Sequence, residues 1–363
     1  MHPVHLCFFN SNVPWGGGEK WHYETALMAC DRGYRVSVVS NAKSELTQRL
    51  ADEKGIELFT LPLGALSFLN PMKIHRLVRF FRERKVDTVI LCLPRDVKAG
   101  GLAAKLAGVP DIIYRRGIAV PVRDRFLNRL LFKHVITKLI VNSLETRRCV
   151  LSENPNLIAK ERIFLVHCGL DVAAFEAKKG KPLVERRPGE ILIGNAARLT
   201  EQKGQRLLID AAVRLKSKHA AFRIFIAGIG ELEAELKGYA RKRGVAQHVE
   251  FLGFVTDMRG FLDSLDIFVL PSLWEGYGIA QMEAMCAGVP VVAFRVSSIP
   301  EVVIEGETGL LSPPDAESLA ANVLLLAQDE ELRRQLGAAG QERVRNNFDI
   351  RKVFDDLEVC LHA

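Results

Sequence analysis

The sequence lacks the patterns that mark a membrane-spanning, disulfide-bonded or metal-binding protein. No apolar run among its 363 residues approaches the length that crosses a bilayer. The seven cysteines are scattered and never spaced as CxxC, and the histidines show no metal-ligand spacing. The apolar stretch Val4–Phe9 is expected to be a first strand rather than a secretion signal. We therefore expect a cytoplasmic protein that needs no metal and no resident cofactor.

The composition is that of a globular protein whose charge is unevenly distributed. Hydrophobic residues make up 48% and charged residues 26% of a chain too long for one ordinary core, so two domains are expected. Residues 1–170 carry 26 Lys and Arg against 15 Asp and Glu, whereas residues 171–363 carry 24 against 28. The basic first half indicates an acidic acceptor, an anionic membrane surface or nucleic acid as a partner, with ordinary solvated surface as the alternative.

Short apolar segments alternate with helical patterns along the whole chain, which is typical of parallel sheets with crossover helices. In the first half we expect strands at Val4–Phe9, Arg35–Ser40, Glu57–Leu61, Thr88–Leu91, Asp111–Tyr114 and Leu139–Asn142. In the second half we expect them at Ile191–Ile193, Arg223–Ala227, Val249–Leu252, Ile267–Leu270 and Val289–Ala293. Two of the expected helices run from about Gly18 to Asp31 and from Pro71 to about Arg84.

The most linker-like segment, residues 176–189 (EAKKGKPLVERRPG), is rich in charge, Pro and Gly. We expect a first domain over residues 1–170, a second over residues 171–345, and a last helix over about residues 346–363. Both domains are expected to be Rossmann-like, that is, doubly wound α/β domains. Two such domains facing each other would place ligand sites at the carboxyl ends of their strands.

The most informative segment, residues 271–290, reads PSLWEGYGIAQMEAMCAGVP. An expected strand runs into the turn Gly276–Gly278 and then into a helix that begins near Ile279. The glycines let a ligand approach the backbone, and the free N–H groups of the first helical turn favour an anion. Glu275 and Glu283 lie on either side of this turn, so they can bind hydroxyls at the two ends of one ligand. Without the preceding strand, such a helix is more often a capped surface helix.

A second segment, residues 194–204, reads GNAARLTEQKG and follows the first expected strand of the second half. Arg198 and Lys203 lie where a guanidinium fork and a compact ammonium could clamp a diphosphate. Taken alone, two basic residues in a loop are more often solvent-facing.

These two segments resemble motifs of the retaining GT-B glycosyltransferases, especially the large family four. The first is similar to the pattern P-S-x-x-E-G-F/Y-G-x-x-x-x-E-A-M-A-x-G-x-P-V-V, and the second to G-R-L-x-x-x-K-G. The resemblance implies a GT-B fold in which Glu275 contacts the hydroxyls of a donor sugar and Glu283 holds those of a ribose. It implies that Arg198 and Lys203 neutralise the donor diphosphate. It also implies that the sugar and diphosphate meet the backbone amides of Gly276, Tyr277, Gly278 and Ile279.

Weaker matches lie between these segments and beyond them. The turn at Gly228 resembles the family's A-G-x-G-P-E turn without its Pro, and the loop at Val255 resembles the one that frames the donor base; a tight strand–helix turn is the alternative at Gly228. Residues 299–303 and 306–311 resemble family segments that we expect to be structural. Together the matches cover about residues 190–315 and predict a nucleotide-sugar site there.

The first half carries a weaker resemblance and one departure. Residues 15–19 (WGGGE) resemble the family's G-G-x-E loop, which implies that Gly17 and Gly18 approach the donor and that Glu19 lies on the acceptor side. A flexible strand–helix connection is the alternative. Many members carry a His after the strand that corresponds to Asp111–Tyr114, whereas here Arg115 and Arg116 take its place. Roles based on that His do not transfer, and we assign both arginines to the acceptor side.

A basic run extends from these arginines toward Lys133 and is interleaved with apolar residues. It contains Arg115, Arg116, Arg123, Arg125, Arg129 and Lys133, with Val120, Val122, Phe126, Leu127 and Leu130 between them. One interpretation is a surface that faces an acceptor or an anionic membrane. The other is a helix at the rim of a cleft that buries its apolar side and solvates its arginines.

The resemblance implies a retaining transfer of a sugar from a nucleotide-sugar to a glycan or glycolipid acceptor. No DxD sequence is present, the pair with which metal-dependent sugar transferases of the other main fold bind metal. The last helix would cross back onto the first domain. Family analogy favours lipopolysaccharide or surface-polysaccharide synthesis at the inner membrane, with peripheral contact to anionic lipid and no nucleic acid as partner. The alternatives are a GT-B nucleotide-sugar epimerase and a non-catalytic nucleotide-sugar-binding scaffold.

Overall fold

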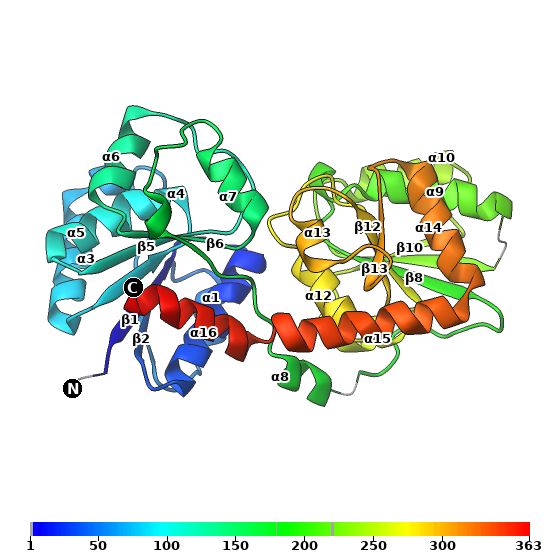
Figure 1. Cartoon of the computed structure of the whole chain (residues 1–363), viewed down its shortest axis with the longest axis horizontal. Coiled ribbons are helices and arrows are strands. Elements are labelled where there is room, and N and C mark those ends of the chain that lie inside the picture. The colour runs from blue at the N-terminus through cyan, green and yellow to red at the C-terminus, as the bar shows by residue number, and fades with distance from the viewer. Residues whose placement is uncertain (1–2, 179, 219–220) are drawn as a thin grey trace. The chain divides into compact units, whose positions relative to one another are not determined.

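The computed structural model describes residues 3–178, 180–218 and 221–363, which form two compact units (Figure 1). The first unit comprises Met1–Gly169 together with Ile350–Ala363, and the second comprises Leu170–Asp349. Each unit is built on one parallel β-sheet with helices on both faces. The expectation of two doubly wound α/β domains is confirmed.

Seven parallel strands form the sheet of the first unit in the order β3-β2-β1-β4-β5-β6-β7. Their bounds are β1 His5–Asn10, β2 Arg35–Ser40, β3 Ile56–Thr60, β4 Thr88–Leu91, β5 Asp111–Arg116, β6 Lys138–Val141 and β7 Ile163–Leu165. The order reverses between β1 and β4, which pair with each other from Leu6 opposite Thr88 onward. A reversal of this kind opens a crevice at the carboxyl ends of the two strands, where ligands of such sheets bind.

The helices of the first unit lie on the two faces of this sheet (Figure 1). One face carries α3 Pro71–Arg84, α4 Pro94–Asp96, α5 Leu102–Ala107, α6 Phe126–His134 and α7 Leu144–Leu151, together with the short turns η1 Ser67–Leu69 and η2 Val97–Gly101, the latter π-helical. The other face carries α1 Gly17–Asp31, α2 Glu45–Leu50 and α16 Ile350–His362. A further turn, η3 Lys160–Arg162, precedes β7.

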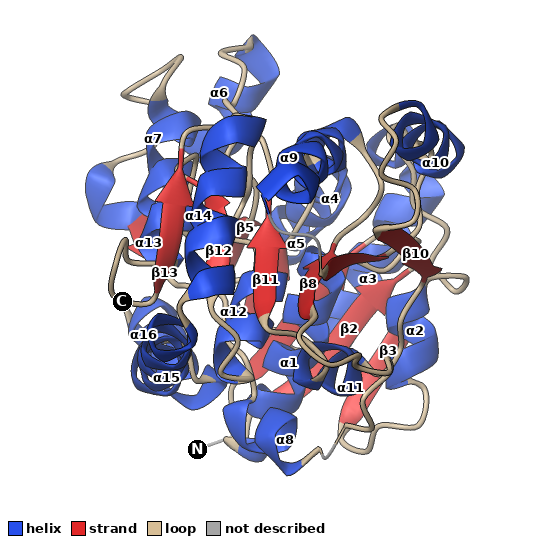
Figure 2. Ribbon diagram, turned by 90° about the vertical axis from the view of Figure 1, so that its right-hand side faces the viewer, coloured by secondary structure: helices blue, strands red, loops and turns tan. Residues whose placement is uncertain are grey.

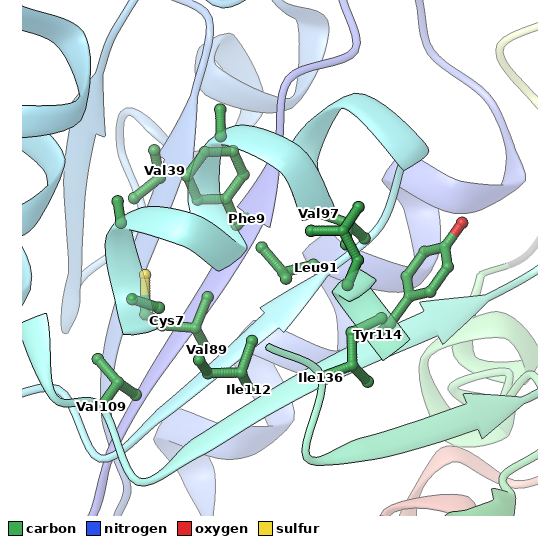
Figure 3. Packing of buried hydrophobic residues seen from close by; sticks show 14 of the residues in the cluster. Cys7, Phe9, Val39, Val89, Leu91, Val97, Val109, Ile112, Tyr114 and Ile136 are labelled. Carbon is green, nitrogen blue, oxygen red and sulfur yellow. The ribbon is translucent and has the colours of Figure 1, made fainter. Parts of the chain in front are cut away.

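Helix α3 shows how local sequence sets these elements. The Asn70 side chain accepts a hydrogen bond from the backbone N–H of Lys73, and Pro71 occupies the first turn, so the helix begins where its free N–H groups are satisfied. The helix buries Leu77 and Phe81 in a core with Phe9, Leu91, Ile112 and Tyr114 of the strands (Figure 3). This apolar stripe holds α3 against the sheet.

Helix α16 belongs to the first unit although 180 residues of the second unit precede it. Its Val353, Phe354 and Leu357 are buried, and it packs on α1. The Arg32 guanidinium at the end of α1 donates hydrogen bonds to Asp355 at 2.7 Å and Glu358 at 3.1 Å. The core of the first unit is therefore completed by the end of the chain.

Six parallel strands form the sheet of the second unit in the order β10-β9-β8-β11-β12-β13. Their bounds are β8 Ile191–Ala196, β9 Phe222–Ala227, β10 Val249–Gly253, β11 Ile267–Leu270, β12 Val291–Phe294 and β13 Gly309–Ser312. The helices are α8 Val172–Ala177, α9 Gln205–Lys218, α10 Glu233–Lys242, α11 Met258–Asp263, α12 Ile279–Cys286, α13 Ile299–Val302, α14 Ala316–Gln328 and α15 Glu330–Asn347, with the turn η4 Glu201–Lys203. Helices α9 and α14 pack together on one face and α12 and α15 on the other (Figure 2).

Most expected strands lie within two residues of the observed ones, and the differences have local causes. Two strands were not expected: β7 has only three residues, and β13 lies in a segment interpreted only as structural. The strand expected at Val289–Ala293 begins at Val291, because Gly288 adopts a left-handed conformation and Pro290 cannot donate to a ladder. The strand expected to end at Tyr114 continues through Arg116, where it pairs with Val141.

Close packing in the first unit predicts the effect of one methyl group. A Cβ at Gly100 would lie 2.8 Å from Phe9 Cε2 and 2.9 Å from Leu91 Cδ2. Gly100→Ala should therefore lower the free energy of unfolding by about 1–3 kcal/mol, measured by urea unfolding followed by circular dichroism. Gly64→Ala is the matched control, because a Cβ there would meet nothing within 4 Å. Equal stability of the two variants would contradict this packing.

Candidate functional site

Four loops at the carboxyl edge of the second sheet are joined into one surface by backbone contacts. Between the β10 and β9 loops, Gly228 N donates to Gly253 O at 2.7 Å. Between the β9 and β8 loops, Leu199 N donates to Ile229 O at 3.0 Å. Between the β8 and β11 loops, Leu273 N donates to Gln202 O at 2.8 Å. The strand order reverses between β8 and β11, so these last two loops flank the crevice of the sheet.

Two glycines allow these loops to approach each other. Gly204 has φ +64°, and a Cβ there would lie 1.9 Å from the carbonyl oxygen of Pro271. Gly228 has φ +141°, and a Cβ there would lie 1.9 Å from the carbonyl oxygen of Ala197. Any other residue would clash with the backbone of the neighbouring loop, so both positions require glycine.

The β8 and β11 loops bring Lys203 and Glu275 together. The Lys203 ammonium donates to Glu275 Oε1 in an ion pair, and Ser272 Oγ donates to the same oxygen at 2.8 Å. The Glu275 side chain is 6% exposed and that of Lys203 is 16% exposed. In the described part of the chain, Glu275 Oε2 accepts no hydrogen bond. One carboxylate oxygen is thus fixed and the other is left to accept a ligand hydroxyl.

The turn after Glu275 leads directly into helix α12. Tyr277 is buried, and Gly278 has φ +78° and ψ 61° as the N-cap residue, with no side chain that caps the helix. Gln281 Nε2 donates to the carbonyl oxygen of Tyr277 at 2.7 Å, which fixes the turn. The first N–H groups of α12 therefore face the carboxyl edge of the sheet without a side-chain acceptor, an arrangement that favours an anion.

The remaining residues expected in the second half lie around this centre. Arg198 is exposed two residues after the end of β8, and its backbone carbonyl accepts a hydrogen bond from Gln205 Nε2 at 2.9 Å. Val255 follows β10 and is half-buried. Glu283 lies on α12, eight residues after Glu275 in sequence, and is half-buried. The structure thus places Arg198 and Val255 after the carboxyl ends of β8 and β10, and Glu283 on the helix that follows β11.

Sequence reasoning missed the polar residues that hold Glu275. Ser272 Oγ donates to Glu275 Oε1, Ser298 Oγ donates to Glu275 O at 3.3 Å, and Gln202 Nε2 donates to the carbonyl oxygen of the preceding residue, Trp274, at 2.9 Å. Ser272 lies in the motif itself, one residue after Pro271, so the sequence alone indicates that it is near Glu275. Ser298 comes from a distant segment whose position depends on the fold, so no local signal marked it.

In the first unit, the expected residues gather at the carboxyl ends of β1 and β5. Gly17 and Gly18 begin α1, and Glu19 is buried and accepts a hydrogen bond from Asn10 Nδ2 at 3.1 Å. His22 lies one turn further along α1, and burial lowers its pKa to about 3, so it is neutral at physiological pH. Glu19 is thus oriented by the strand end that precedes it.

Arg115 and Arg116 are not part of an exposed basic run, because both are buried within β5. Arg115 is 3% exposed and stacks on Trp21 at 4.4 Å, with a hydrogen bond to Cys168 Sγ at 3.3 Å. Arg116 is 8% exposed and donates to Tyr114 OH at 3.1 Å and Val120 O at 2.9 Å. Successive side chains of a strand point to opposite faces, so the two guanidiniums are used on different sides of the sheet.

Asp96 is a buried carboxyl at the same edge of the first sheet. Its Oδ2 accepts hydrogen bonds from Leu93 N at 3.0 Å and Ser11 N at 3.4 Å. Burial raises the pKa of Asp96 to about 7 despite these hydrogen bonds.

The described residues hold no cluster of three or more His, Cys, Asp or Glu side chains suited to a metal ion. Among the same residues, every helix is too short or too polar to span a membrane.

The Lys203–Glu275 pair predicts a specific pattern of stability. Lys203→Met leaves a buried carboxylate without its cation and should lower the stability of the second unit by about 3 kcal/mol, roughly 6–12 °C in unfolding temperature. Adding Glu275→Gln removes the uncompensated charge and should restore most of the loss. Arg198→Met, an equal charge change at an exposed site, should have little effect in differential scanning fluorimetry. A double variant no more stable than Lys203→Met would argue against the pair.

Asp96 predicts a pH dependence of the first unit. Its pKa is about 7 in the folded protein and near 4 in an unfolded chain. The folded state binds the additional proton between these values, so stability should fall as pH rises from about 4 to 7, by up to about 1.4 kcal/mol per pH unit. Asp96→Asn should flatten this slope in urea unfolding, whereas Asp52→Asn, at an exposed position, should not. The same slope in wild type and Asp96→Asn would exclude Asp96 as its source.

Two family models match the chain. The model described as glycosyl transferases group 1 matches residues 178–343, and the one described as Glycosyltransferase Family 4 matches residues 15–174. The amylovoran biosynthesis glycosyltransferase AmsK of Erwinia amylovora is 36% identical over 210 residues, which cover 55% of this chain and 51% of that protein. The lipopolysaccharide core biosynthesis mannosyltransferase LpsB of Rhizobium meliloti is 34% identical over 186 residues, covering 48% and 52%. The matched region thus spans about half the length of these curated relatives.

The fold is also that of a solved structure. The crystal structure of Anabaena Alr3699/HepE in complex with UDP-glucose has a TM-score of 0.82 at 20% identity and covers 99% of this chain and 100% of that one. At this identity the likeness shows the fold alone, and it is the GT-B fold. The family models, the relatives and the fold agree that the chain belongs to the group 1, family 4 glycosyltransferases.

Proposed function

We propose that the chain is a retaining glycosyltransferase that moves a sugar from a nucleoside-diphosphate sugar, held by its second unit, to a glycan or glycolipid acceptor. The observation that carries the proposal is the half-free Glu275 carboxylate, fixed by Lys203 and Ser272 beside the uncapped start of α12. A fixed acceptor of hydroxyl hydrogen bonds next to an anion-binding helix end suits a ligand that joins a sugar to a diphosphate.

In the proposed reaction the second unit stabilises the leaving group. Arg198, Lys203 and the first N–H groups of α12 neutralise the charge that develops on the diphosphate as the glycosidic bond breaks. Glu275 Oε2 holds hydroxyls of the sugar, and Glu283 holds those of the ribose. Since both glutamates are engaged with hydroxyls, neither serves as a nucleophile, and the acceptor attacks from the same face as the departing phosphate. The phosphate takes the acceptor proton. Attack from this face retains the anomeric configuration.

The acceptor and its setting are proposed from the relatives. AmsK and LpsB are named for amylovoran and lipopolysaccharide core synthesis, which favours an acceptor in surface-polysaccharide or lipopolysaccharide assembly. Glu19, Arg115 and Arg116 are proposed for the acceptor side, with Gly17 and Gly18 toward the donor. We place the protein in the cytoplasm with peripheral contact to the inner membrane, in agreement with the basic first half of the sequence.

Donor binding tests the site directly. Calorimetry with UDP, GDP, ADP and their sugar conjugates should show selective binding of one diphosphate. Arg198→Ala and Glu283→Ala should weaken it by about tenfold or more, since each removes charge-assisted hydrogen bonds. Arg206→Ala is the matched control, because that arginine is 57% exposed and pairs with Glu235 on the helix surface. If no nucleotide binds at millimolar concentration, the donor site is refuted.

Turnover tests the role of Glu275. Glu275→Gln keeps an acceptor oxygen for Ser272 but loses the negative charge that the reacting sugar uses, so kcat should fall by about 100-fold or more with the fold retained. Glu317→Gln, at a side chain 76% exposed, should not change kcat. Acceptor-dependent release of nucleoside diphosphate is the readout, because an epimerase would act without acceptor and a scaffold would release none. Near wild-type turnover of Glu275→Gln would remove this residue from the mechanism.

A further inference from the structure

A set of apolar side chains is exposed on and before helix α6 of the first unit. Phe126 is 76% exposed, and Ile118, Val120, Leu127 and Leu130 are each between 38% and 43% exposed. We call these five residues the α6 surface. Isolated exposed apolar residues are ordinary, but here five lie within 13 positions of one segment, which is unusual for plain solvated surface and favours an interaction site. The interpretation of this segment as a helix that buries its apolar side is therefore only partly correct, because Leu131 and Phe132 are the buried residues of α6.

Basic side chains surround the α6 surface. Arg123, Arg125, Arg129 and Lys133 are all exposed. The acidic residue among them, Asp124, already accepts hydrogen bonds from Arg129 Nε at 2.7 Å and from Asn154 Nδ2 at 2.8 Å. Among the described residues, Arg123, Arg125 and Lys133 make no ion pair. Their charges are thus left for an external anionic partner.

The segment is held in shape although its side chains are exposed. Val122 is buried, Val120 O accepts a hydrogen bond from the buried Arg116, and Asn128 Nδ2 donates to Arg123 O at 2.7 Å. The Asp124 N–H donates to Glu153 Oε2 at 2.9 Å, which ties the loop to the end of α7. A preformed surface needs little ordering when it binds.

The mixture of apolar and basic side chains at the α6 surface favours a membrane over a protein as its partner. The cores of protein interfaces are depleted of charged residues, whereas here arginine and lysine alternate with the apolar side chains. Aromatic and aliphatic side chains flanked by Arg and Lys are typical of segments that lie at a membrane surface, where the apolar groups enter the headgroup region and the cations meet anionic lipid. We propose that the α6 surface docks the protein on a bilayer that contains anionic phospholipid.

This inference rests on the proposed function in one respect: the proposed function supplies the reason for docking, namely access to a glycolipid acceptor. The surface itself needs no nucleotide and no turnover, so membrane docking and donor binding fail independently.

Vesicle co-sedimentation of the full-length protein tests the inference. Binding is expected to phosphatidylcholine vesicles that contain about one third phosphatidylglycerol, but not to pure phosphatidylcholine, and it should weaken in high salt. Phe126→Ser with Leu130→Ser should lower the partition coefficient by roughly tenfold for each side chain. Arg123→Gln with Arg125→Gln should lower it by about fivefold for each charge.

Matched controls are Val359→Ser, an apolar side chain 65% exposed on α16, and Arg241→Gln, an exposed arginine of α10; both should bind vesicles like wild type. Circular dichroism and nucleotide calorimetry on every variant separate loss of docking from loss of folding or of the donor site. Unchanged vesicle binding by the α6 variants, or none by wild type, overturns the inference. A wild-type dimer in light scattering that Phe126→Ser with Leu130→Ser abolishes would assign the surface to self-association and overturn it as well. Vesicle binding without nucleotide binding would refute the donor site alone.

Discussion

The close approach of the β8 and β11 loops is the constraint on which the site of the second unit depends. Gly204 adopts a left-handed conformation against the carbonyl of Pro271, and this contact brings Lys203 to Glu275. Gly228 repeats the arrangement between the β9 and β8 loops. Loops are the mobile parts of most folds, but here glycines let backbone meet backbone, so the loops that carry Lys203 and Glu275 support each other.

The two units satisfy buried cations in different ways. In the second unit Lys203 is balanced by the Glu275 carboxylate, so this pair carries no net charge. In the first unit the hydrogen bonds of Arg115 and Arg116 go to a thiol, a phenol and a carbonyl, and Arg115 also lies over an indole ring. A guanidinium tolerates such neutral surroundings better than an ammonium because its charge is delocalised and less strongly hydrated.

The sequence predicted the fold class and the strand–turn–helix around Glu275 because both depend on local patterns. Strand–turn–helix order, the glycine turn at Gly276–Gly278 and the spacing of Glu275 and Glu283 all lie within one segment. Features that depend on contacts between residues far apart in the sequence could not be predicted from it. Arg115 and Arg116 were assigned to a basic run because their neighbours in sequence are basic, whereas burial by Trp21 and Tyr114 decides their environment. Likewise Ser298 reaches Glu275 only through the packing of α13.

The position of α16 has a consequence for how the protein is made. Its buried Phe354 and Leu357 complete a unit whose other residues are synthesised first, with Leu170–Asp349 in between. At typical rates of translation the ribosome spends about 10–40 s on those intervening residues. During this time the α1 surface that α16 covers stays open to solvent, so the second unit can finish folding before the first. The first unit is thus begun first and completed last.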